Sequence, residues 1–245
     1  LDYGPENILV STGAKQSIAN AVLAIADAGD EVIIPTPFWV TYSEIVKLAG
    51  GKVVLVKSTV KNNFKITAQQ LEAAITAKTK LFMFSSPCNP SGAVYSKEEL
   101  NGLAEVFKQH PAIYILSDEI YEHINYIGKH ESIAQFDFLK ERVILINGLS
   151  KAFAMTGWRL GYFAANTEIV KACDKIQGQF TSAACSITQR AAIEALTGNL
   201  QPTQLMIEEF RKRRARVMEL VKDIPGFICN EPPGAFYIFP DVSYY

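Results

Sequence analysis

The sequence has almost no net charge, few cysteines and no long apolar run. Its 24 lysines and arginines nearly balance 25 aspartates and glutamates, leaving a formal net charge of −1. This balance does not favour nucleic acid or a membrane surface as the main partner, because both select for an excess of basic residues. No apolar stretch reaches the about 18 residues of a membrane-spanning helix, and no secretory signal peptide is present. We therefore expect a cytoplasmic protein with no nucleic-acid or membrane partner.

The one concentration of positive charge is the run RKRRAR at residues 211–216. It follows two glutamates, and the pairs Glu208–Lys212 and Glu209–Arg213 have the i,i+4 spacing of ion pairs on a helix surface. The pattern predicts a solvated helix face in preference to a nucleic-acid site.

Disulfide and metal-binding patterns are also missing. The four cysteines are Cys88, Cys173, Cys185 and Cys229. They form no C-x-x-C pair and are irregularly spaced, which predicts reduced thiols. The three histidines are His110, His123 and His130. They lack H-E-x-x-H or any other ligand spacing, so surface or structural roles are favoured and we predict no metal site.

What the chain does contain is a regular alternation of apolar runs and amphipathic stretches. Strands are predicted at 7–11, 31–35, 52–56, 80–87, 112–121 and 142–150, and helices at 14–29, 39–50, 67–76 and 96–110. Ser96 and Glu99 form a capping box at the start of the last helix. This βα rhythm, with strands that are apolar throughout, predicts an α/β fold with a mostly parallel sheet covered by helices on both faces.

Several polar motifs follow the predicted strands directly. They are STGAK after NILV, PTPFW after EVII, SSPCNPSG after KLFMF, SDEIY after AIYIL and NGLSK after RVILI. Because ligands of such folds bind beyond the carboxyl ends of the strands, we expect these motifs to meet at one rim of the sheet. STGAKQS lacks the G-x-x-x-x-G-K-[ST] pattern of a P-loop, although a strand-to-helix turn of this kind can still hold a phosphate on free N–H groups.

The pattern changes near residue 200. Residues 201–226 predict one long amphipathic helix, and residues 227–240 predict two short strands around a Pro-Pro-Gly turn. We expect a large domain over 1–200 and the start of a small α+β domain over 201–245. The chain begins without methionine and ends on the apolar run AFYIFPDVSYY, so we expect it to be a fragment that lacks both ends.

Five motifs, taken in order, resemble one family. They are STGAKQ, PTPFW, NPSGA, SDEIY and GLSKAFAMTGWRLGY. Together they resemble the class I (fold type I) pyridoxal-phosphate-dependent aminotransferases, in particular the aspartate-aminotransferase-like subgroup, over essentially the whole chain. The resemblance implies a three-layer α/β/α large domain with pyridoxal 5′-phosphate as cofactor.

The resemblance implies a role for each motif residue around the cofactor ring. Lys151 would form the Schiff base, and a dry, cation-rich pocket would lower its pKa as such an amine requires. Asp118 would pair with the pyridine nitrogen and keep the ring protonated. Tyr121 would donate to the phenolic oxygen of the ring. Asn89 would bind the same oxygen and contact the substrate carboxylate, and Trp39 would stack on the ring face and border the substrate.

Other residues would hold the phosphate. Arg159 would bind two of its oxygens at once, and Gly13, Ala14 and Lys15 would donate backbone N–H groups. Many relatives carry a hydroxyl residue three positions before the lysine, where this chain has glycine; Ser150, next to the lysine, is held as a candidate in its place. Gly161 and Tyr162 are expected to pack in the following strand, and the bond before Pro90 is a cis candidate.

The resemblance implies transfer of an amino group between an L-amino acid, aspartate or a similar one, and a 2-oxo acid, with ping-pong kinetics in a homodimer. The family's arginine for the substrate carboxylate would lie beyond residue 245, so the fragment itself could be inactive. Two alternatives stay open. The same fold hosts C–S lyases and cyclopropane-carboxylate synthases, and the same domain occurs as a ligand sensor in transcription regulators.

Overall fold

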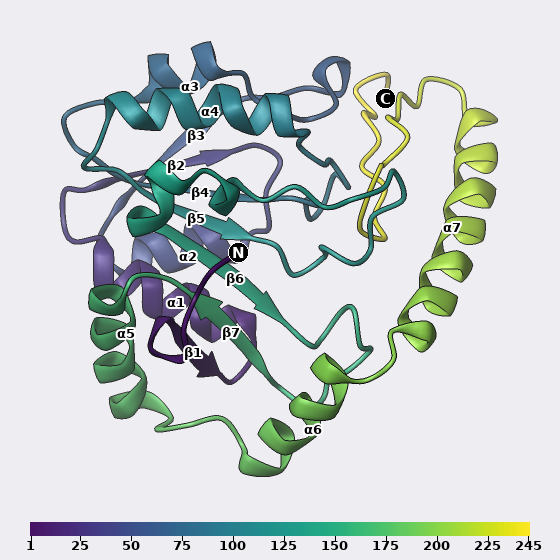
Figure 1. Ribbon diagram of the computed structural model, residues 1–245. Coiled ribbons are helices and arrows are strands. Elements are labelled where there is room, and N and C mark those ends of the chain that lie inside the picture. Colours follow the sequence, from purple (N-terminus) through teal and green to yellow (C-terminus); the bar gives the residue numbers. More distant parts are fainter.

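The computed structural model describes residues 1–245, and its centre is a seven-stranded sheet with the order β1-β7-β6-β5-β4-β2-β3 (Figure 1). The strands are β1 (Ile8–Ser11), β2 (Glu31–Pro35), β3 (Lys52–Val56), β4 (Thr79–Ser85), β5 (Tyr114–Asp118), β6 (Val143–Gly148) and β7 (Gly161–Ala164). Only β7 runs against its two neighbours, β1 and β6. The other five strands therefore share one direction with β1, as a mostly parallel sheet requires.

Helices cover both faces of this sheet. They are α1 (Ala14–Ile25), α2 (Thr41–Leu48), α3 (Ala68–Ala74), α4 (Lys97–Gln109), α5 (Thr167–Phe180), α6 (Ser186–Thr197) and α7 (Gln201–Lys222), with short 3-10 turns at Pro5–Asn7, Val60–Asn62, Ile133–Gln135 and Asp137–Arg142. One buried cluster joins α1, α2 and α5 to the sheet, and a second joins α3 and α4 to its other face. The predicted α/β/α layering is confirmed.

Alternation along β4 explains the two cores. Leu81 and Met83 belong to the first cluster, whereas Phe82 and Phe84 belong to the second. Successive side chains of a strand point to opposite faces, so a strand buried on both faces must be apolar at every position. The apolar run KLFMF meets that demand. None of the helices combines the length and apolarity that crossing a membrane requires.

Local signals place the helix starts. Ser96 and Glu99 form the expected capping box on α4, with Ser96 Oγ accepting from the Glu99 N–H at 3.2 Å. Thr67 caps α3 in the same way through the Gln70 N–H at 3.2 Å. Each cap satisfies an N–H that the first helical turn leaves without a backbone partner.

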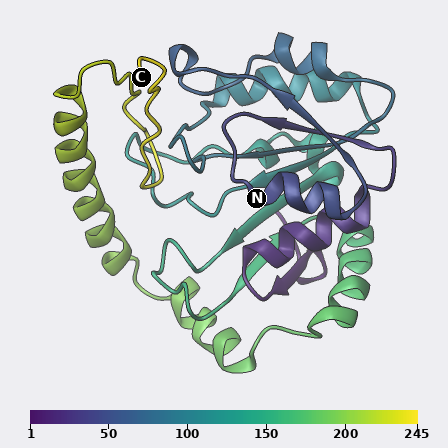
Figure 2. The same ribbon diagram turned by 180° about the vertical axis from the view of Figure 1, so that it is seen from behind.

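The C-terminal part leaves the sheet. α7 runs along one side of the molecule, and the segment after it turns back between α7 and the strand ends (Figures 1 and 2). The prediction of two strands over 227–240 is wrong, since this segment makes only isolated bridges, Asn125↔Gly234 and Ile228↔Asp241. The reason is that its backbone bonds to itself only between Ile228 and Asp241, and in its middle bonds to loops: Gly234 N donates to Gly92 O and Ala235 N donates to Ile124 O.

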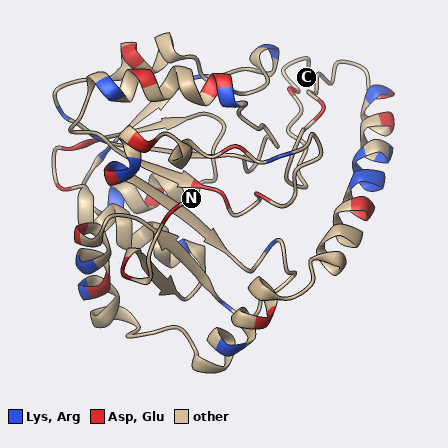
Figure 3. Ribbon diagram, viewed as in Figure 1, with Lys and Arg blue, Asp and Glu red and all other residues tan.

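The basic run lies on α7, where acidic residues alternate with it along the helix (Figure 3). Lys212, Arg213 and Arg216 are exposed. Arg211 and Arg214 turn inward, where they donate to Tyr126 O and Pro232 O at 3.0 and 2.8 Å. The predicted pair Glu209–Arg213 is present at 3.2 Å, while Glu208 pairs with Arg211 at 3.4 Å instead of with Lys212. Lys212 lies 3.8 Å from Glu209. The prediction of a solvated, ion-paired helix face is therefore confirmed for the exposed residues, with one partner exchanged, and wrong for Arg211 and Arg214, which anchor the helix to the rest of the chain.

Candidate active site

A cavity of about 260 Å³ lies at the carboxyl ends of the parallel strands. It is lined by Ala14, Lys15, Trp39, Tyr42, Ser85, Asn89, Asp118, Ile120, Tyr121, Ser150, Lys151, Thr156, Arg159 and Tyr237. The motifs that follow five different strands thus meet at one place, as the sequence predicted. Of the residues expected around the cofactor, Gly13 alone is not in the lining, and it adjoins the Arg159 guanidinium.

Lys151 follows the end of β6, in a tight turn after Gly148. Its Nζ lies 5.8 Å from the ring centre of Tyr121 and 5.6 Å from that of Phe236. Burial lowers the pKa of the Lys151 ammonium and the nearby Arg159 guanidinium lowers it further, while Asp118 opposes both. The amine is therefore easier to deprotonate than an ordinary surface lysine, which suits a nucleophile or a base.

Asp118 ends β5 and is only 4% exposed. Its Oδ2 accepts a hydrogen bond from the Tyr42 hydroxyl at 2.6 Å, and its Oδ1 accepts from the Ile120 N–H at 3.2 Å. Burial raises the pKa of the carboxyl to about 6, although both hydrogen bonds and Lys151 act in the opposite direction. No ion pair neutralises this carboxylate, so a buried negative charge faces the cavity.

The start of α1 forms a cradle of backbone N–H groups. The Gly13 N–H already donates to Ser11 O at 2.8 Å, whereas Ala14 and Lys15 make no backbone hydrogen bond through their N–H groups. Gly13 has a φ of 86° and lies so close to Arg159 that a Cβ there would collide with the guanidinium. Free N–H groups at a helix start, together with an arginine, are the usual means of holding a phosphate.

Gly161 determines how closely this cradle approaches the sheet. A Cβ on Gly161 would lie 2.7 Å from Ala14 Cα and nearer still to Ala14 N. Gly161 pairs with Gly148 across β6 and β7, and a Cβ on Gly148 would lie 2.9 Å from Gly161 Cα. The packing role expected for Gly161 is thus a backbone-to-backbone contact that brings α1, Lys151 and Arg159 together.

The loop after Lys151 carries two residues in the left-handed backbone region, Ala154 (φ 53°) and Arg159 (φ 52°). Non-glycine residues adopt this region at a cost, and such residues cluster at functional sites. Arg159 Nη1 donates to Thr156 O at 2.7 Å, which fixes the side chain beside the cradle. Ser150 also lines the cavity, from the position next to Lys151.

Three further predicted residues border the cavity. Trp39 is half-buried and packs edge-on against Tyr42, with ring centres 5.8 Å apart. Asn89 follows β4, and its bond to Pro90 is cis, as the resemblance implied; the bonds before Pro37 and Pro87 are cis as well. Burial raises the pKa of Tyr121, so its hydroxyl remains a proton donor.

The side chain of Lys15 adds a positive charge at the cavity. The residue is exposed, and its Nζ lies 4.8 Å from the centre of the Trp39 ring. The sequence reasoning assigned Lys15 through its backbone N–H alone. The structure therefore places the Lys15 ammonium group at the cavity as well, over the Trp39 ring.

Sequence reasoning missed five lining residues: Tyr42, Ser85, Ile120, Thr156 and Tyr237. Tyr42 could have been found, since it lies one helical turn after Trp39 and a buried aspartate needs a donor. Tyr237 could not, because nothing in the sequence places the segment after α7 against the sheet. Its hydroxyl lies 2.6 Å from that of Tyr121.

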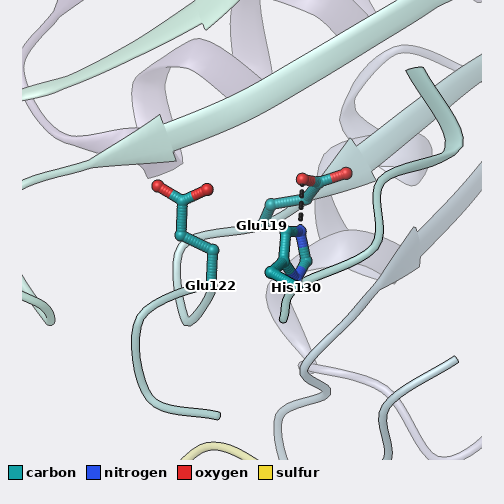
Figure 4. A group of neighbouring side chains, drawn as sticks. All are labelled: Glu119, Glu122 and His130. Carbon is teal, nitrogen blue, oxygen red and sulfur yellow. Dashed lines mark hydrogen bonds and ion pairs between the residues drawn. The ribbon is translucent and has the colours of Figure 1, made fainter. Parts of the chain in front are cut away.

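A second cluster of ionisable groups lies just beyond Asp118 (Figure 4). Glu119 is 2% exposed; its Oε2 lies 2.6 Å from His130 Nε2, and its Oε1 accepts from the hydroxyls of Ser117 and Ser132. The carboxylate is thereby satisfied within the protein. We interpret this network as structural, tying the end of β5 to the loop that returns at residue 130.

The cysteines take no part in the site's charge arrangement. All four are free thiols, as the sequence predicted, with Cys88 and Cys173 buried. Burial raises the pKa of both buried thiols, to about 12 for Cys173. A thiol held protonated by burial is a poor nucleophile, whereas the pKa of the Lys151 amine in the cavity is lowered.

Comparison with known proteins agrees with the motifs. Residues 1–245 match the family model described as "Aminotransferase class I and II". The chain is 49% identical to the aspartate aminotransferase of Bacillus subtilis (strain 168), covering 99% of this chain and 62% of that protein. It is 45% identical to the aspartate/prephenate aminotransferase of Cereibacter sphaeroides, covering 99% and 61%.

Solved structures give the same result. The aspartate aminotransferase from Rhizobium meliloti superposes with a TM-score of 0.97 at 44% identity, over 99% of this chain and 61% of that one. The aspartate aminotransferase from Thermus thermophilus with maleate gives 0.93 at 40% identity, over 100% and 64%. The chain thus spans about three fifths of the length of these relatives. By the family match, the shared fold and the motifs that meet in one cavity, this chain belongs to the class I and II aminotransferases.

Proposed function

We propose that the whole protein is a pyridoxal-phosphate-dependent aminotransferase that moves an amino group between an acidic L-amino acid, aspartate or a close analogue, and a 2-oxo acid. One observation carries the proposal. A lysine of lowered pKa, an unneutralised buried carboxylate and a helix start beside an arginine all face one cavity. The names of the relatives, which are aminotransferases, favour amino transfer over elimination.

The residues present fit the cofactor. Asp118 is a buried anion without a cation, and its raised pKa means that the protein alone does not stabilise its charge. A protonated ring nitrogen would supply the missing partner. The cradle at Ala14 and Lys15, with Arg159 behind it, suits a phosphate dianion. The flat side of the Trp39 indole suits an aromatic ring.

Each group would hold one part of the cofactor. Lys151 would hold the aldehyde carbon, Asp118 the ring nitrogen, and Tyr121 and Asn89 the phenolic oxygen; Trp39 would cover a ring face. The phosphate would lie on the free N–H groups of Ala14 and Lys15, with Gly13, Arg159 and Ser150 beside it; the Gly13 N–H, expected to donate as well, is bonded to Ser11 O. When bound, the cofactor supplies an electron sink for negative charge on the substrate Cα.

The protein's part in the reaction is then proton handling. Lys151 Nζ would take the proton from the substrate Cα and hold it until it is returned during the same half-reaction. Burial and the charge of Arg159 favour the neutral form of this amine, which is the form that can accept a proton. Asp118 would stay ionised throughout and hold the proton on the ring nitrogen.

The substrate class follows from the charge at the cavity. Lys15 Nζ, over the Trp39 ring, is a cation that neither the cradle nor Asp118 uses. It is suited to pair with the distal carboxylate of an acidic substrate. The relatives named for aspartate, and the one solved with maleate, support the same class. The 2-oxo acid acceptor would occupy the same position after each half-reaction.

We further propose that residues 1–200 form the large domain, that residue 201 begins the small domain, and that the whole protein is a cytoplasmic homodimer. The departure of α7 from the sheet supports the division. The length of the relatives beyond this chain leaves room for the rest of the small domain.

The test is cofactor loading followed by turnover. Purified protein is mixed with pyridoxal phosphate, reduced with borohydride and mapped by mass spectrometry; the adduct is expected on Lys151 and absent in Lys151→Ala. Lys171→Ala, an exposed lysine on α5, is the matched control and should load normally. In the whole protein, aspartate and a 2-oxo acid should yield oxaloacetate. Pyruvate and ammonia from cysteine-like donors, with no oxaloacetate, would favour a lyase instead.

A further inference from the structure

The carboxylate of Asp118 is held from behind by a residue far away in the sequence. Tyr42, on α2, lies 76 positions before Asp118, and its hydroxyl donates to Asp118 Oδ2 at 2.6 Å. Both side chains are buried, Tyr42 at 1% exposure and Asp118 at 4%. The only other hydrogen bond to the carboxylate comes from the Ile120 N–H, at the longer distance of 3.2 Å.

The position of the Tyr42 ring is determined by packing. Tyr42 belongs to the core cluster that α1, α2 and α5 form against the sheet. Trp39, three residues earlier, packs edge-on against it at an interplanar angle of 79°. One turn of chain thus places an indole at the cavity and a phenol beneath it. Because packing already fixes the Tyr42 ring, its hydroxyl is held in one position and little side-chain entropy is lost when it bonds to Asp118.

The direction of the hydrogen bond is also determined. Burial raises the pKa of the Tyr42 phenol well above its usual value, and Asp118 raises it further, so the phenol keeps its proton and donates it. A phenylalanine would fill the same apolar space. A buried hydroxyl is unfavourable unless it is paired, so the pairing with Asp118 accounts for a tyrosine at this position.

The other ionisable groups near Asp118 come from four elements. They are Tyr42 on α2, Cys88 after β4, Glu119 and Tyr121 after β5, and Lys151 after β6. Glu119 disfavours the charged carboxylate and Lys151 favours it, and neither makes a hydrogen bond to it. Tyr42 is therefore the only side chain that can both orient the carboxylate and stabilise its charge by direct contact.

We propose that Tyr42 is a positioning residue, whose hydroxyl fixes the rotation of the Asp118 carboxylate and keeps it ionised toward the cavity. The inference rests on the proposed function only in naming what Asp118 meets there, the ring nitrogen of the cofactor. In this role Tyr42 acts through Asp118.

The decisive experiment is made without cofactor, so it does not depend on the reaction. The free energy of unfolding is measured by urea titration between pH 4 and pH 9 for two pairs of proteins. The first pair is wild type and Asp118→Asn, and the second is Tyr42→Phe and the double variant Tyr42→Phe/Asp118→Asn. The difference within each pair reports the titration of Asp118 alone. Loss of a hydrogen bond to a charged group should move the midpoint of that titration upward by about one to two pH units in the Tyr42→Phe pair. An unchanged midpoint would overturn the proposal.

Tyr126→Phe is the matched control. Its hydroxyl donates to Ala235 O at 2.7 Å, away from Asp118, so this change should lower stability without moving the midpoint. Should Tyr42→Phe fail to fold, the double variant Tyr42→Phe/Asp118→Asn should fold, because the unsupported charge is gone. Failure of the double variant, with Asp118→Asn folded, would assign Tyr42 to packing alone and refute the proposal.

A second readout adds pyridoxal phosphate. At pH 7 its dissociation constant should be about two- to tenfold larger for Tyr42→Phe than for wild type, because a raised pKa leaves part of the Asp118 carboxyl protonated. If wild type itself binds no cofactor, the proposed function fails while the unfolding measurement still decides the role of Tyr42. If wild type binds and both proteins bind equally, the positioning role fails and the proposed function stands.

Discussion

Replacing Gly161 by alanine should separate the start of α1 from the sheet. The added Cβ would lie 2.7 Å from Ala14 Cα and closer to Ala14 N, and both are backbone atoms that cannot rotate away. Overpacking of this kind costs about 1–3 kcal/mol, and a backbone obstacle puts the cost near 3. For a chain of 245 residues that corresponds to a fall of roughly 6–12 °C in the melting temperature.

The same substitution should weaken cofactor binding. Ala14 and Lys15 provide the free N–H groups of the cradle, and Gly161 is the residue against which that turn rests. A shift of a few tenths of an ångström there lengthens the hydrogen bonds to the phosphate, so we expect at least about tenfold weaker binding of pyridoxal phosphate, the loss of one charged hydrogen bond.

Gly178→Ala is the matched control, measured by the same calorimetry and binding titration. Gly178 lies in α5, and a Cβ there meets no atom within 4 Å. Alanine should therefore stabilise the protein by about 0.5–1 kcal/mol and leave binding unchanged. The reasoning is refuted if Gly161→Ala melts within 2 °C of wild type, or if it binds the cofactor as tightly.

Three other predictions concern charge. Burial raises the folded-state pKa of Asp118 to about 6 from an ordinary 3.8, so the stability of the cofactor-free protein should fall by up to about 3 kcal/mol as pH rises through that interval. Asp118→Asn should abolish this fall, measured by urea unfolding at each pH. An identical slope of stability against pH in both proteins would contradict the prediction. Lys15→Met should lower kcat/KM for aspartate by about tenfold or more in the whole protein while sparing uncharged donors, because one charged hydrogen bond is lost; an equal loss for all donors would point to the cradle instead. Burial lowers the pKa of His130, but the contact with Glu119 outweighs burial and the net pKa is raised. The stability that this pair contributes should therefore be full below pH 6.5 and be lost as pH rises through the folded-state pKa of His130. A His130→Gln protein that loses the same stability over this pH range would show that another group is responsible.

The sequence predicted much of this architecture because the relevant signals are local. Apolar runs such as KLFMF require burial on both faces, and the capping pairs Ser96–Glu99 and Thr67–Gln70 mark helix starts through contacts within four residues. Polar motifs at strand ends converge in any parallel sheet, so Lys151 and Asp118 were expected to meet. The failed prediction of strands over 227–240 concerned a segment whose middle, at Gly234 and Ala235, bonds to distant loops, which local patterning does not reveal.

Sequence alone determined the α/β class, the family and the residues that carry its chemistry, because each of these depends on residue type and spacing along the chain. The tertiary structure alone decided which groups modify that chemistry. Tyr42 reaches Asp118 across 76 residues, Tyr237 reaches Tyr121 across 116, and the raised pKa of Asp118 comes from burial by several elements at once. Such contacts and the desolvation they cause depend on how the layers pack, and packing is a property of the folded chain as a whole.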